Sequence, residues 1–174
     1  MSNFKAELHK IKAFAFDVDG VMTNGYVMMY KDGDLFRQFN SKDGFAVRYA
    51  TSIGFPIAII TGGSSETIIK RYNQLGVTDI YLKSRYKLPD FDDFCAKYDL
   101  QRSEVLFMGD DIPDIDVLRI CGMPTCPADA VPEVKEIVKY ISNHNGGEGC
   151  VRDIIEQVLK VHGRWGDNLH IPST

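Results

Sequence analysis

Phe14-Ala15-Phe16-Asp17-Val18-Asp19-Gly20 is the stretch that decides the fold of this chain. In it, an apolar run stops abruptly at two carboxylates placed one residue apart. Side chains two positions apart in an extended segment point the same way, so Asp17 and Asp19 converge where the strand gives way to a loop. Such a pair can hold a cation, or one carboxylate can attack phosphorus while its neighbour moves a proton. Taken alone, the motif is explained equally well as an Asx turn that closes the strand.

Length, composition and charge limit the number of domains and the kinds of partner that this chain can have. The 174 residues suit one domain, and 44% hydrophobic and 25% charged residues are typical of a globular chain. A net charge of -4 gives no electrostatic footprint for nucleic acid or an anionic membrane, so neither is an expected partner. We expect residues 1–162 to form a single domain, followed by a tail over 163–174 that is either disordered or docked.

Cysteine usage and hydropathy favour a cytoplasmic location. The four cysteines form neither a C-x-x-C pair nor the spacing of a zinc site, and the N-terminus does not resemble a secretory signal. Each thiol is expected to be a small buried hydrophobic group rather than a ligand. No apolar run approaches the ~20 residues of a membrane span.

Apolar runs alternate with amphipathic segments along the rest of the chain. Strands are predicted at about 13–16, 56–60, 80–82, 105–108 and 124–126, and helices at about 44–52, 65–75, 88–98, 112–120, 131–138 and 151–161. This alternation predicts an α/β fold, a doubly wound parallel sheet with helices on both faces. Apolar runs that flank an Asp-Gly turn predict a protruding β-hairpin at about 26–39, packed on the body of the chain or on another subunit.

Residues suited to bind a cation or a phosphate follow three of the predicted core strands. The strand ends deliver Asp17 and Asp19, then Thr61 and Gly62, then Asp110 and Asp111, with Asp114 one turn later. Ligands of parallel sheets bind at the carboxyl ends of the strands, so we expect these side chains to meet. Clustered carboxylates require a counter-charge, for which Mg²⁺ is the best candidate. Thr61 is suited to hold phosphoryl oxygens, and Lys87 to reach back as a fixed positive charge.

Each of these features also has a purely structural explanation. The residues from Thr61 to Ser65 suit a helix N-cap, Asp110 could cap the next helix, and Lys87 would ordinarily be a solvated surface lysine. Their joint occurrence, each directly after a buried strand or before a helix, favours one shared site.

These motifs resemble the haloacid dehalogenase superfamily of phosphotransferases over residues 11–161. The four motifs are the run that starts at Asp17, Thr61-Gly62, Lys87, and Gly109-Asp110-Asp111-Ile112-Pro113-Asp114. The resemblance implies a Rossmann-like sheet. The segment between Asp19 and Thr61 has room for the hairpin and one helix, so we expect no cap domain.

The resemblance also implies a role for each residue of the reaction. Asp17 is the nucleophile that forms an aspartyl-phosphate, and Asp19 is the general acid/base. Thr61, Gly62 and Lys87 hold the phosphoryl group.

The same resemblance implies a magnesium site. Asp17, Asp110 and the backbone carbonyl of Asp19 are the expected ligands of Mg²⁺. Asp111 is expected to act through a metal-bound water, and Asp114 to orient the lysine of the third motif.

Within the superfamily, the chain resembles a capless branch that hydrolyses phosphates of keto-sugar acids and assembles as a homotetramer through its hairpins. The runs 39–44 and 146–152 carry this finer resemblance. It implies a phosphomonoesterase of lipopolysaccharide precursor synthesis that acts on an eight-carbon keto-sugar acid, which Gln74 favours. A nine-carbon acid of the sialic acid type is the alternative, because Gly63 matches the pattern of neither group.

Three further expectations remain open. Arg71 matches a basic residue at the subunit interface of the family and is expected to contact the substrate carboxylate, although a solvated helix arginine is an equal explanation. The tail is expected to dock near a neighbouring active site and to aid product release. A rival from another class is a non-enzymatic phospho-Asp receiver domain, but receivers place the phosphorylated Asp after a central strand rather than after the first.

Overall fold

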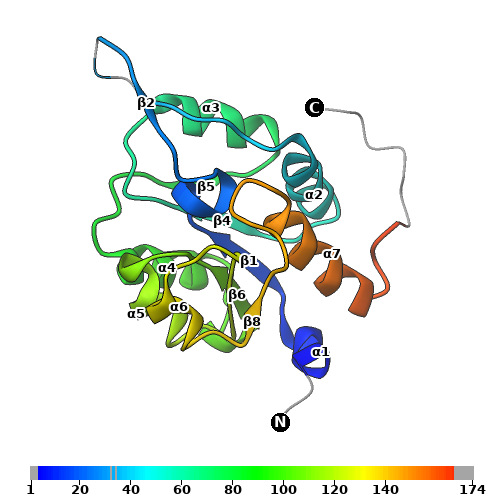
Figure 1. The fold of residues 1–174 in the computed structure, drawn as a ribbon. Coiled ribbons are helices and arrows are strands. Elements are labelled where there is room, and N and C mark those ends of the chain that lie inside the picture. Colours follow the sequence, from blue (N-terminus) through cyan, green and yellow to red (C-terminus); the bar gives the residue numbers. More distant parts are fainter. Residues whose placement is uncertain (1–3, 32, 34, 167–174) are drawn as a thin grey trace.

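A parallel sheet of six strands forms the centre of the computed structural model, which describes residues 4–31, 33 and 35–166 (Figure 1). The strand order is β5-β4-β1-β6-β7-β8. Their bounds are β1 (Ala13–Phe16), β4 (Ile57–Ile60), β5 (Asp79–Tyr81), β6 (Val105–Met108), β7 (Met123–Cys126) and β8 (Tyr140–Ile141). The predicted doubly wound α/β fold is confirmed, and β8 is an additional short edge strand.

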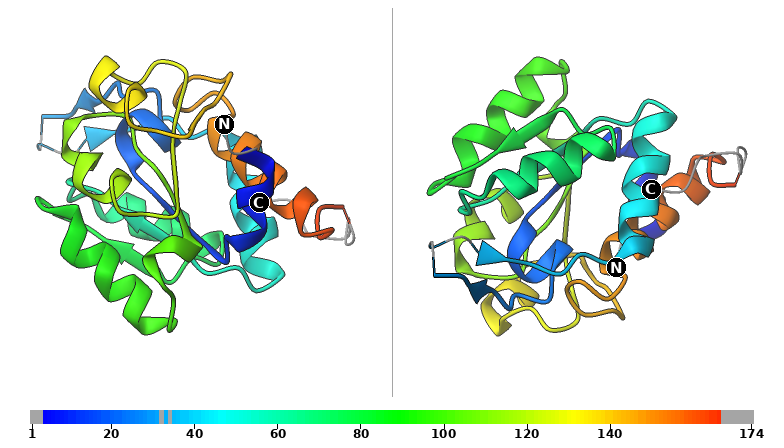
Figure 2. Two further views of the ribbon diagram at one scale, coloured as in Figure 1. Left: turned by 90° about the horizontal axis from the view of Figure 1, so that it is seen from below. Right: turned by 90° about the horizontal axis from the view of Figure 1, so that it is seen from above.

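Strand β1 lies between β4 and β6, and all four of its residues are buried. Phe14 and Phe16 point into one core, which α2 (Ser41–Ser52), α3 (Glu66–Gln74) and α7 (Cys150–Val161) cover. Ala13 and Ala15 point into the opposite core, beneath α4 (Lys87–Lys97), α5 (Ile115–Leu118) and α6 (Pro132–Lys135) (Figure 2). The alternation of large and small side chains therefore sorts the helices to both faces of the sheet.

Several helices differ from the predicted bounds. Helix α2 begins before the predicted start because the Asn40 side chain accepts hydrogen bonds from the backbone N–H groups of Lys42 and Asp43. The helix predicted at 112–120 divides into a 3₁₀ turn, η4 (Ile112–Asp114), and the short α5, and α6 is likewise a single turn. Other short elements are α1 (Phe4–Glu7), η1 (Leu8–Lys10), η2 (Val18–Met22) and η3 (Arg102–Glu104). No helix in the described part of the chain could span a membrane.

The predicted hairpin is present, with a shorter ladder than expected. Strands β2 (Met28–Met29) and β3 (Leu35–Phe36) pair antiparallel and project beyond the carboxyl ends of the sheet (Figure 1). Met28 is 60% exposed and Met29 is 78% exposed, so the body of the chain does not cover the hairpin. The hairpin and α2 occupy the segment between the first two motifs, and its described residues form no cap domain.

The two runs of sequence that carry the finer resemblance join α2 to α7. The buried carboxylate of Asp43 accepts hydrogen bonds from the backbone N–H groups of Gly149 at 3.2 Å and Arg152 at 2.7 Å, and so caps α7. Asn40 donates to the carbonyl of Gly147 at 3.1 Å. The runs 39–44 and 146–152 are thus structural partners of each other.

The first residues of the tail are docked on their own subunit. The Trp165 ring lies 4.9 Å from the Tyr49 ring and stands beneath the guanidinium of Arg152 at 5.6 Å. Tyr49 also donates to the carbonyl of Arg164 and accepts from the N–H of Gly166. Residues 167–174 lie outside the described residues, so a role of the tail at a neighbouring active site stays a prediction.

Candidate active site

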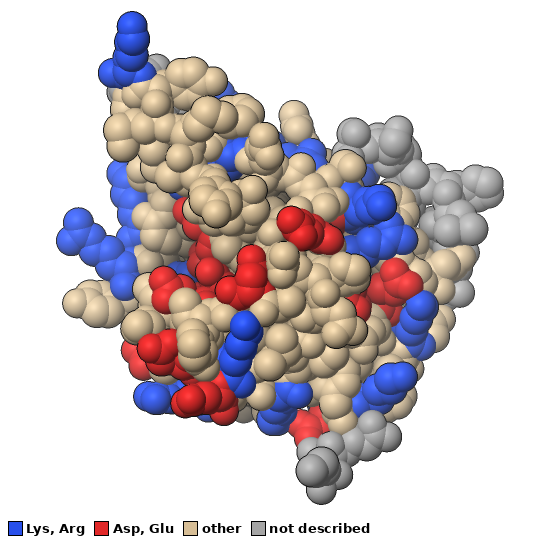
Figure 3. All heavy atoms as spheres, in the orientation of Figure 1, with Lys and Arg blue, Asp and Glu red and all other residues tan. Residues whose placement is uncertain are grey.

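An open cavity of about 430 Å³ lies at the carboxyl ends of the central strands. Its lining includes the predicted residues Asp17, Asp19, Thr61, Gly62, Lys87, Asp110, Asp111 and Asp114. Figure 3 shows acidic side chains gathered in this region, below the largely uncharged projection of the hairpin. The topology of the sheet therefore brings together residues from all four motifs.

Asp17 is held at the end of β1 by the backbone and by one lysine. Its N–H donates to the carbonyl of Met108, and its Oδ1 accepts from the N–H of Val18 at 2.7 Å. The Nζ of Lys87 lies 2.9 Å from the same oxygen. The carboxylate is therefore fixed in direction, as in-line attack on a bound phosphorus requires.

Lys87 is the first residue of α4 and is buried, so the alternative of a solvated surface lysine is wrong. Its Nζ lies 2.6 Å from Oδ1 of Asp114. The other oxygen of Asp114 accepts from the N–H groups of Asp110 at 2.9 Å and Asp111 at 3.3 Å. Asp114 thus orients the lysine and also fixes the backbone of the fourth motif.

The helices that follow Thr61 and Asp110 are capped by other residues, Ser65 and Asp111. Ser65 accepts from the N–H of Thr67 and caps α3, while Thr61 is buried and accepts from the N–H of Gly63 at 3.1 Å. Asp111 accepts from the N–H of Ile112 and caps η4. Thr61 and Asp110 are therefore not the N-caps of these two helices.

Gly20 lets the first and fourth motifs approach each other. Its φ is +88°, in the left-handed region that favours glycine, and a Cβ built on it would lie 2.0 Å from Oδ2 of Asp110. Any side chain at this position would displace Asp110.

Burial and crowding disturb the charges of the site. Burial, together with the neighbouring charge of Asp114, raises the pKa of Asp17 to about 7. Burial and the charges of Asp17 and Asp114 raise the pKa of Asp110 to about 8. Burial opposes the charge on Lys87, but the carboxylates of Asp17 and Asp114 raise its pKa above the ordinary value. One ammonium group does not balance three carboxylates, so the cluster calls for a further cation.

Three carboxylates of the site lie close enough together to share a cation. Oxygen atoms of Asp17, Asp110 and Asp114 all lie within 4.8 Å of one another. Oδ1 of Asp110 is buried and has no hydrogen-bond partner among the described residues, although buried polar atoms are ordinarily paired. An orphaned carboxylate oxygen in an oxygen-rich cluster suits a hard ion such as Mg²⁺.

Arg71 does not join this group. Its guanidinium lies over Gly44 at the start of α2, where a Cβ would come 2.4 Å from Nη2, and it lines a small crevice between α2 and α3. A contact between Arg71 and the substrate of its own subunit has no support in this placement. A contact with the substrate of another subunit stays a prediction.

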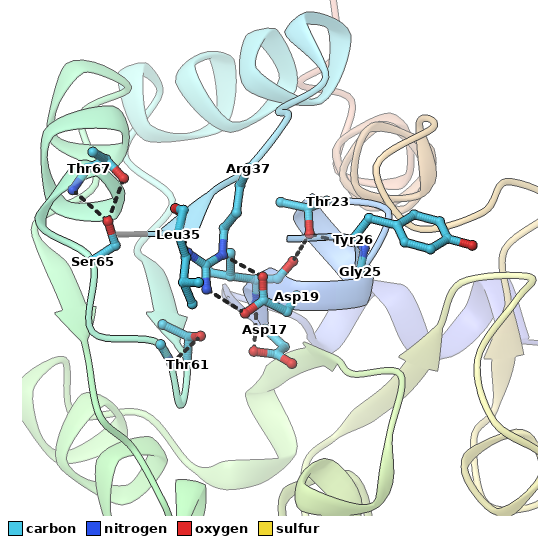
Figure 4. Close-up of polar contacts among 12 residues, drawn as sticks. Asp17, Asp19, Thr23, Gly25, Tyr26, Leu35, Arg37, Thr61, Ser65 and Thr67 are labelled. Carbon is cyan, nitrogen blue, oxygen red and sulfur yellow. Dashed lines mark hydrogen bonds and ion pairs between the residues drawn. The ribbon is translucent and has the colours of Figure 1, made fainter. Parts of the chain in front are cut away.

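Arg37 is a residue that the sequence analysis missed. It follows β3, is buried, and forms an ion pair with Asp19 in which Nε lies 2.6 Å from Oδ1 (Figure 4). A charged residue at the inner end of an otherwise apolar hairpin strand was the available signal in the sequence.

A family model described as haloacid dehalogenase-like hydrolase matches residues 76–154. The chain is also 31% identical over 159 residues to the 3-deoxy-D-manno-octulosonate 8-phosphate phosphatase KdsC of Escherichia coli K12, over 91% of this chain and 85% of that protein. With the fold and the four motifs, this identity shows that the chain belongs to the haloacid dehalogenase-like hydrolases.

Solved structures narrow the class further. A 3-deoxy-D-manno-octulosonate 8-phosphate phosphatase from Yersinia pestis superposes with a TM-score of 0.92 at 29% identity, covering 95% of this chain and 90% of that one. A phosphatase of the same name from Moraxella catarrhalis, in complex with magnesium, phosphate and KDO, has a TM-score of 0.88 at 29% identity and 92% coverage of both chains. The chain is a phosphoric monoester hydrolase that resembles the 3-deoxy-D-manno-octulosonate 8-phosphate phosphatases, and not a receiver domain.

Proposed function

We propose that this protein hydrolyses 3-deoxy-D-manno-octulosonate 8-phosphate to the free sugar acid and phosphate, as a step of lipopolysaccharide precursor synthesis in the cytoplasm. The observation that carries the proposal is the fixed Asp17 carboxylate at the floor of an open cavity, paired with a buried lysine. The relative from Moraxella catarrhalis, whose structure contains phosphate and KDO, supports the choice of substrate.

The reaction proceeds in two displacements at phosphorus. Asp17 Oδ attacks the phosphorus, the bond between phosphorus and the sugar oxygen breaks, and an aspartyl-phosphate forms. Asp19 donates a proton to the departing sugar oxygen. It then accepts a proton from the water that attacks the aspartyl-phosphate, which releases phosphate and restores Asp17.

Phosphoryl binding falls to the residues beside the nucleophile. Lys87 provides a fixed positive charge, and the Thr61 hydroxyl with the Gly62 backbone holds phosphoryl oxygens. The carboxylates of Asp17 and Asp110 and the carbonyl of Asp19 would hold Mg²⁺, with Asp111 acting through a metal-bound water. When bound, Mg²⁺ would neutralise charge that the phosphoryl oxygens carry.

The exposed apolar surface of the hairpin predicts that the protein assembles with further copies of itself. The hairpin exposes Tyr26, Met28, Met29 and Phe36, and isolated hairpins with such an apolar surface are marginal in water. We propose that these residues pack on neighbouring subunits in a homotetramer. In such an assembly Arg71 would reach the substrate carboxylate of a neighbour.

A panel of phosphorylated keto-sugar acids tests the substrate. We expect kcat/KM to be highest for the eight-carbon 8-phosphate, and at least about tenfold lower for the nine-carbon 9-phosphate of the sialic acid type, since one misplaced contact costs about this much. A preference for the nine-carbon ester would replace the proposed substrate and keep the reaction. Absence of phosphate release from every member of the panel would overturn the proposal.

A further inference from the structure

The guanidinium of Arg37 donates two hydrogen bonds to the carboxylate of Asp19. Nε lies 2.6 Å from Oδ1 and Nη2 lies 3.0 Å from Oδ2 (Figure 4). The Arg37 side chain is 3% exposed, whereas the Asp19 side chain is 35% exposed. The buried guanidinium is thus the fixed partner, and it holds a carboxylate that opens onto the cavity.

The surroundings of Arg37 fit a guanidinium. Its Nη1 donates to the carbonyl of Leu35 at 3.3 Å, which ties the side chain to the end of β3. A Cβ built on Gly63 would lie 3.3 Å from Nη2 of Arg37 and 3.4 Å from Oγ1 of Thr61. A side chain at position 63 would therefore be in tight contact with the guanidinium, which lies close to the phosphate-binding loop.

We propose that Arg37 is a positioning residue that aligns Asp19 with the departing sugar oxygen and with the hydrolytic water. This inference rests on the proposed function, in which Asp19 is the general acid/base. When Oδ2 carries the proton it gives up its contact with Nη2 while the contact from Nε to Oδ1 persists, so Arg37 holds Asp19 in place and transfers no proton itself. A misplacement of a catalytic group by 1 Å costs about 10²-fold in rate, which sets the scale of the effect.

The role of Asp19 makes Arg37 testable with two kinds of ester. The ratio kcat/KM reports steps up to the first irreversible one, here the formation of the aspartyl-phosphate. An alkyl phosphate needs a proton on its leaving oxygen in that step, whereas p-nitrophenyl phosphate has a good leaving group and does not. Loss of an aligned acid therefore lowers kcat/KM for the alkyl ester and spares it for the aryl ester.

The test compares Arg37→Met, Arg37→Lys, Asp19→Asn and wild type on both esters with Mg²⁺ present. For Arg37→Met we expect kcat/KM to fall about 10²-fold for the alkyl ester and less than about threefold for the aryl ester. Turnover should fall for both esters, because hydrolysis of the aspartyl-phosphate needs Asp19 as a base. Arg37→Lys keeps the charge without the fork and should lie between Arg37→Met and wild type.

Controls separate positioning from other roles. Arg119→Met changes an exposed arginine at the end of α5 and should leave the ratio between the two esters unchanged. Equal losses of kcat/KM on both esters in Arg37→Met would mean that Arg37 binds phosphate or only maintains the fold, and would overturn the inference. Thermal melting of each variant identifies a folding defect. If Arg37→Met has one, the ratio between the two esters in Arg37→Lys decides whether Arg37 positions Asp19 or only binds phosphate or maintains the fold.

The outcome for Asp19→Asn separates this inference from the proposed function. If Asp19→Asn spares the aryl ester and Arg37→Met does not, Arg37 has another role and the proposed acid/base stands. If Asp19→Asn fails to discriminate between the esters, the role of Asp19 in the proposed function is wrong, and the inference falls with it.

Discussion

Asp17 has to meet two opposed requirements. It must be ionised to attack phosphorus, yet burial and the charge of Asp114 raise its pKa to about 7. Lys87 offsets part of this effect from 2.9 Å, and a divalent cation between Asp17 and Asp110 would offset more. The same burial that threatens the charge also strengthens each electrostatic contact with a bound phosphoryl group.

At the residue scale, Gly20→Ala tests the contact between the first and fourth motifs. The new Cβ would lie 2.0 Å from Oδ2 of Asp110, so the carboxylate must move from its present place, where we propose that it binds Mg²⁺. We expect kcat/KM at a fixed Mg²⁺ concentration to fall by at least about 10²-fold, measured by phosphate release.

Gly54→Ala is the matched control for this change. Gly54 has the same φ of +88°, with nothing within 4 Å of a built Cβ. It should lose about 1–2 kcal/mol of stability from the left-handed backbone and keep its activity. Equal activity of the two variants would mean that the approach of Gly20 to Asp110 does not matter for the reaction.

At the scale of elements, Asp43→Ala tests the joint between α2 and α7. The buried Asp43 carboxylate accepts two backbone N–H groups of α7, at 3.2 Å and 2.7 Å. Its removal leaves these donors unpaired, so we expect the free energy of unfolding in urea to fall by about 2–3 kcal/mol. Asp92→Ala removes an exposed ion pair with Arg102 and should cost about 0–1 kcal/mol. Similar losses for the two variants would contradict the capping role of Asp43.

Elements that local sequence determines were predicted closely. Strands β4 and β6 are runs of four buried apolar residues, and their ends match the prediction to within one residue. Strand β8 was missed because it is only two residues long, although Tyr140 and Ile141 are both residue types that favour strands. Helix α5 is shorter than its apolar period predicts, because Asp111 and Pro113 start a 3₁₀ turn that Asp114 ties to the active site.

Among the residues of the active site, too, those that local sequence places were predictable and the others were not. Asp17, Thr61, Lys87 and Asp110 were predictable because they follow strands or start a helix at one edge of a parallel sheet. Arg37 carried only a weak signal, a charge beside an apolar hairpin strand, and its pairing with Asp19, 18 residues earlier in the chain, depends on a long-range placement that the local pattern does not reveal.

At the scale of the whole molecule, the exposed hairpin predicts assembly. Met29 is 78% exposed, and a charge there would oppose burial against another subunit. We expect Met29→Glu to shift the protein toward the 19.6 kDa monomer in analytical ultracentrifugation, with its fold unchanged by circular dichroism. Tyr86→Glu, at a residue that is 82% exposed in the loop before α4, is the control and should keep the wild-type mass. A monomeric wild-type protein would contradict the proposed tetramer.

Magnesium should stabilise the whole molecule in a pH-dependent way. The pKa of Asp110 is raised from 3.8 to about 8, so the metal-free folded state holds a proton that the unfolded state has lost between these values. Stability of the metal-free protein therefore falls as pH rises through this window. Because Mg²⁺ competes with protons for the carboxylates, it should raise Tm by several degrees at about pH 8.5 and by much less at about pH 5.5. An equal shift at both values, or none, would contradict metal binding at Asp110.

The most direct test of the reaction is the chemical identity of the phosphorylated residue. Asp19→Asn protein is mixed with p-nitrophenyl phosphate and Mg²⁺, because this ester forms the aspartyl-phosphate without a proton donor and the variant lacks the base that hydrolyses it. The reaction is quenched in acid within milliseconds to seconds, and the protein is digested for mass spectrometry. We predict a phosphoryl group on the peptide that contains Asp17, and none in the double variant that also carries Asp17→Asn. Release of phosphate without any covalent label, or a label on another residue, would contradict the assignment of Asp17 as the nucleophile.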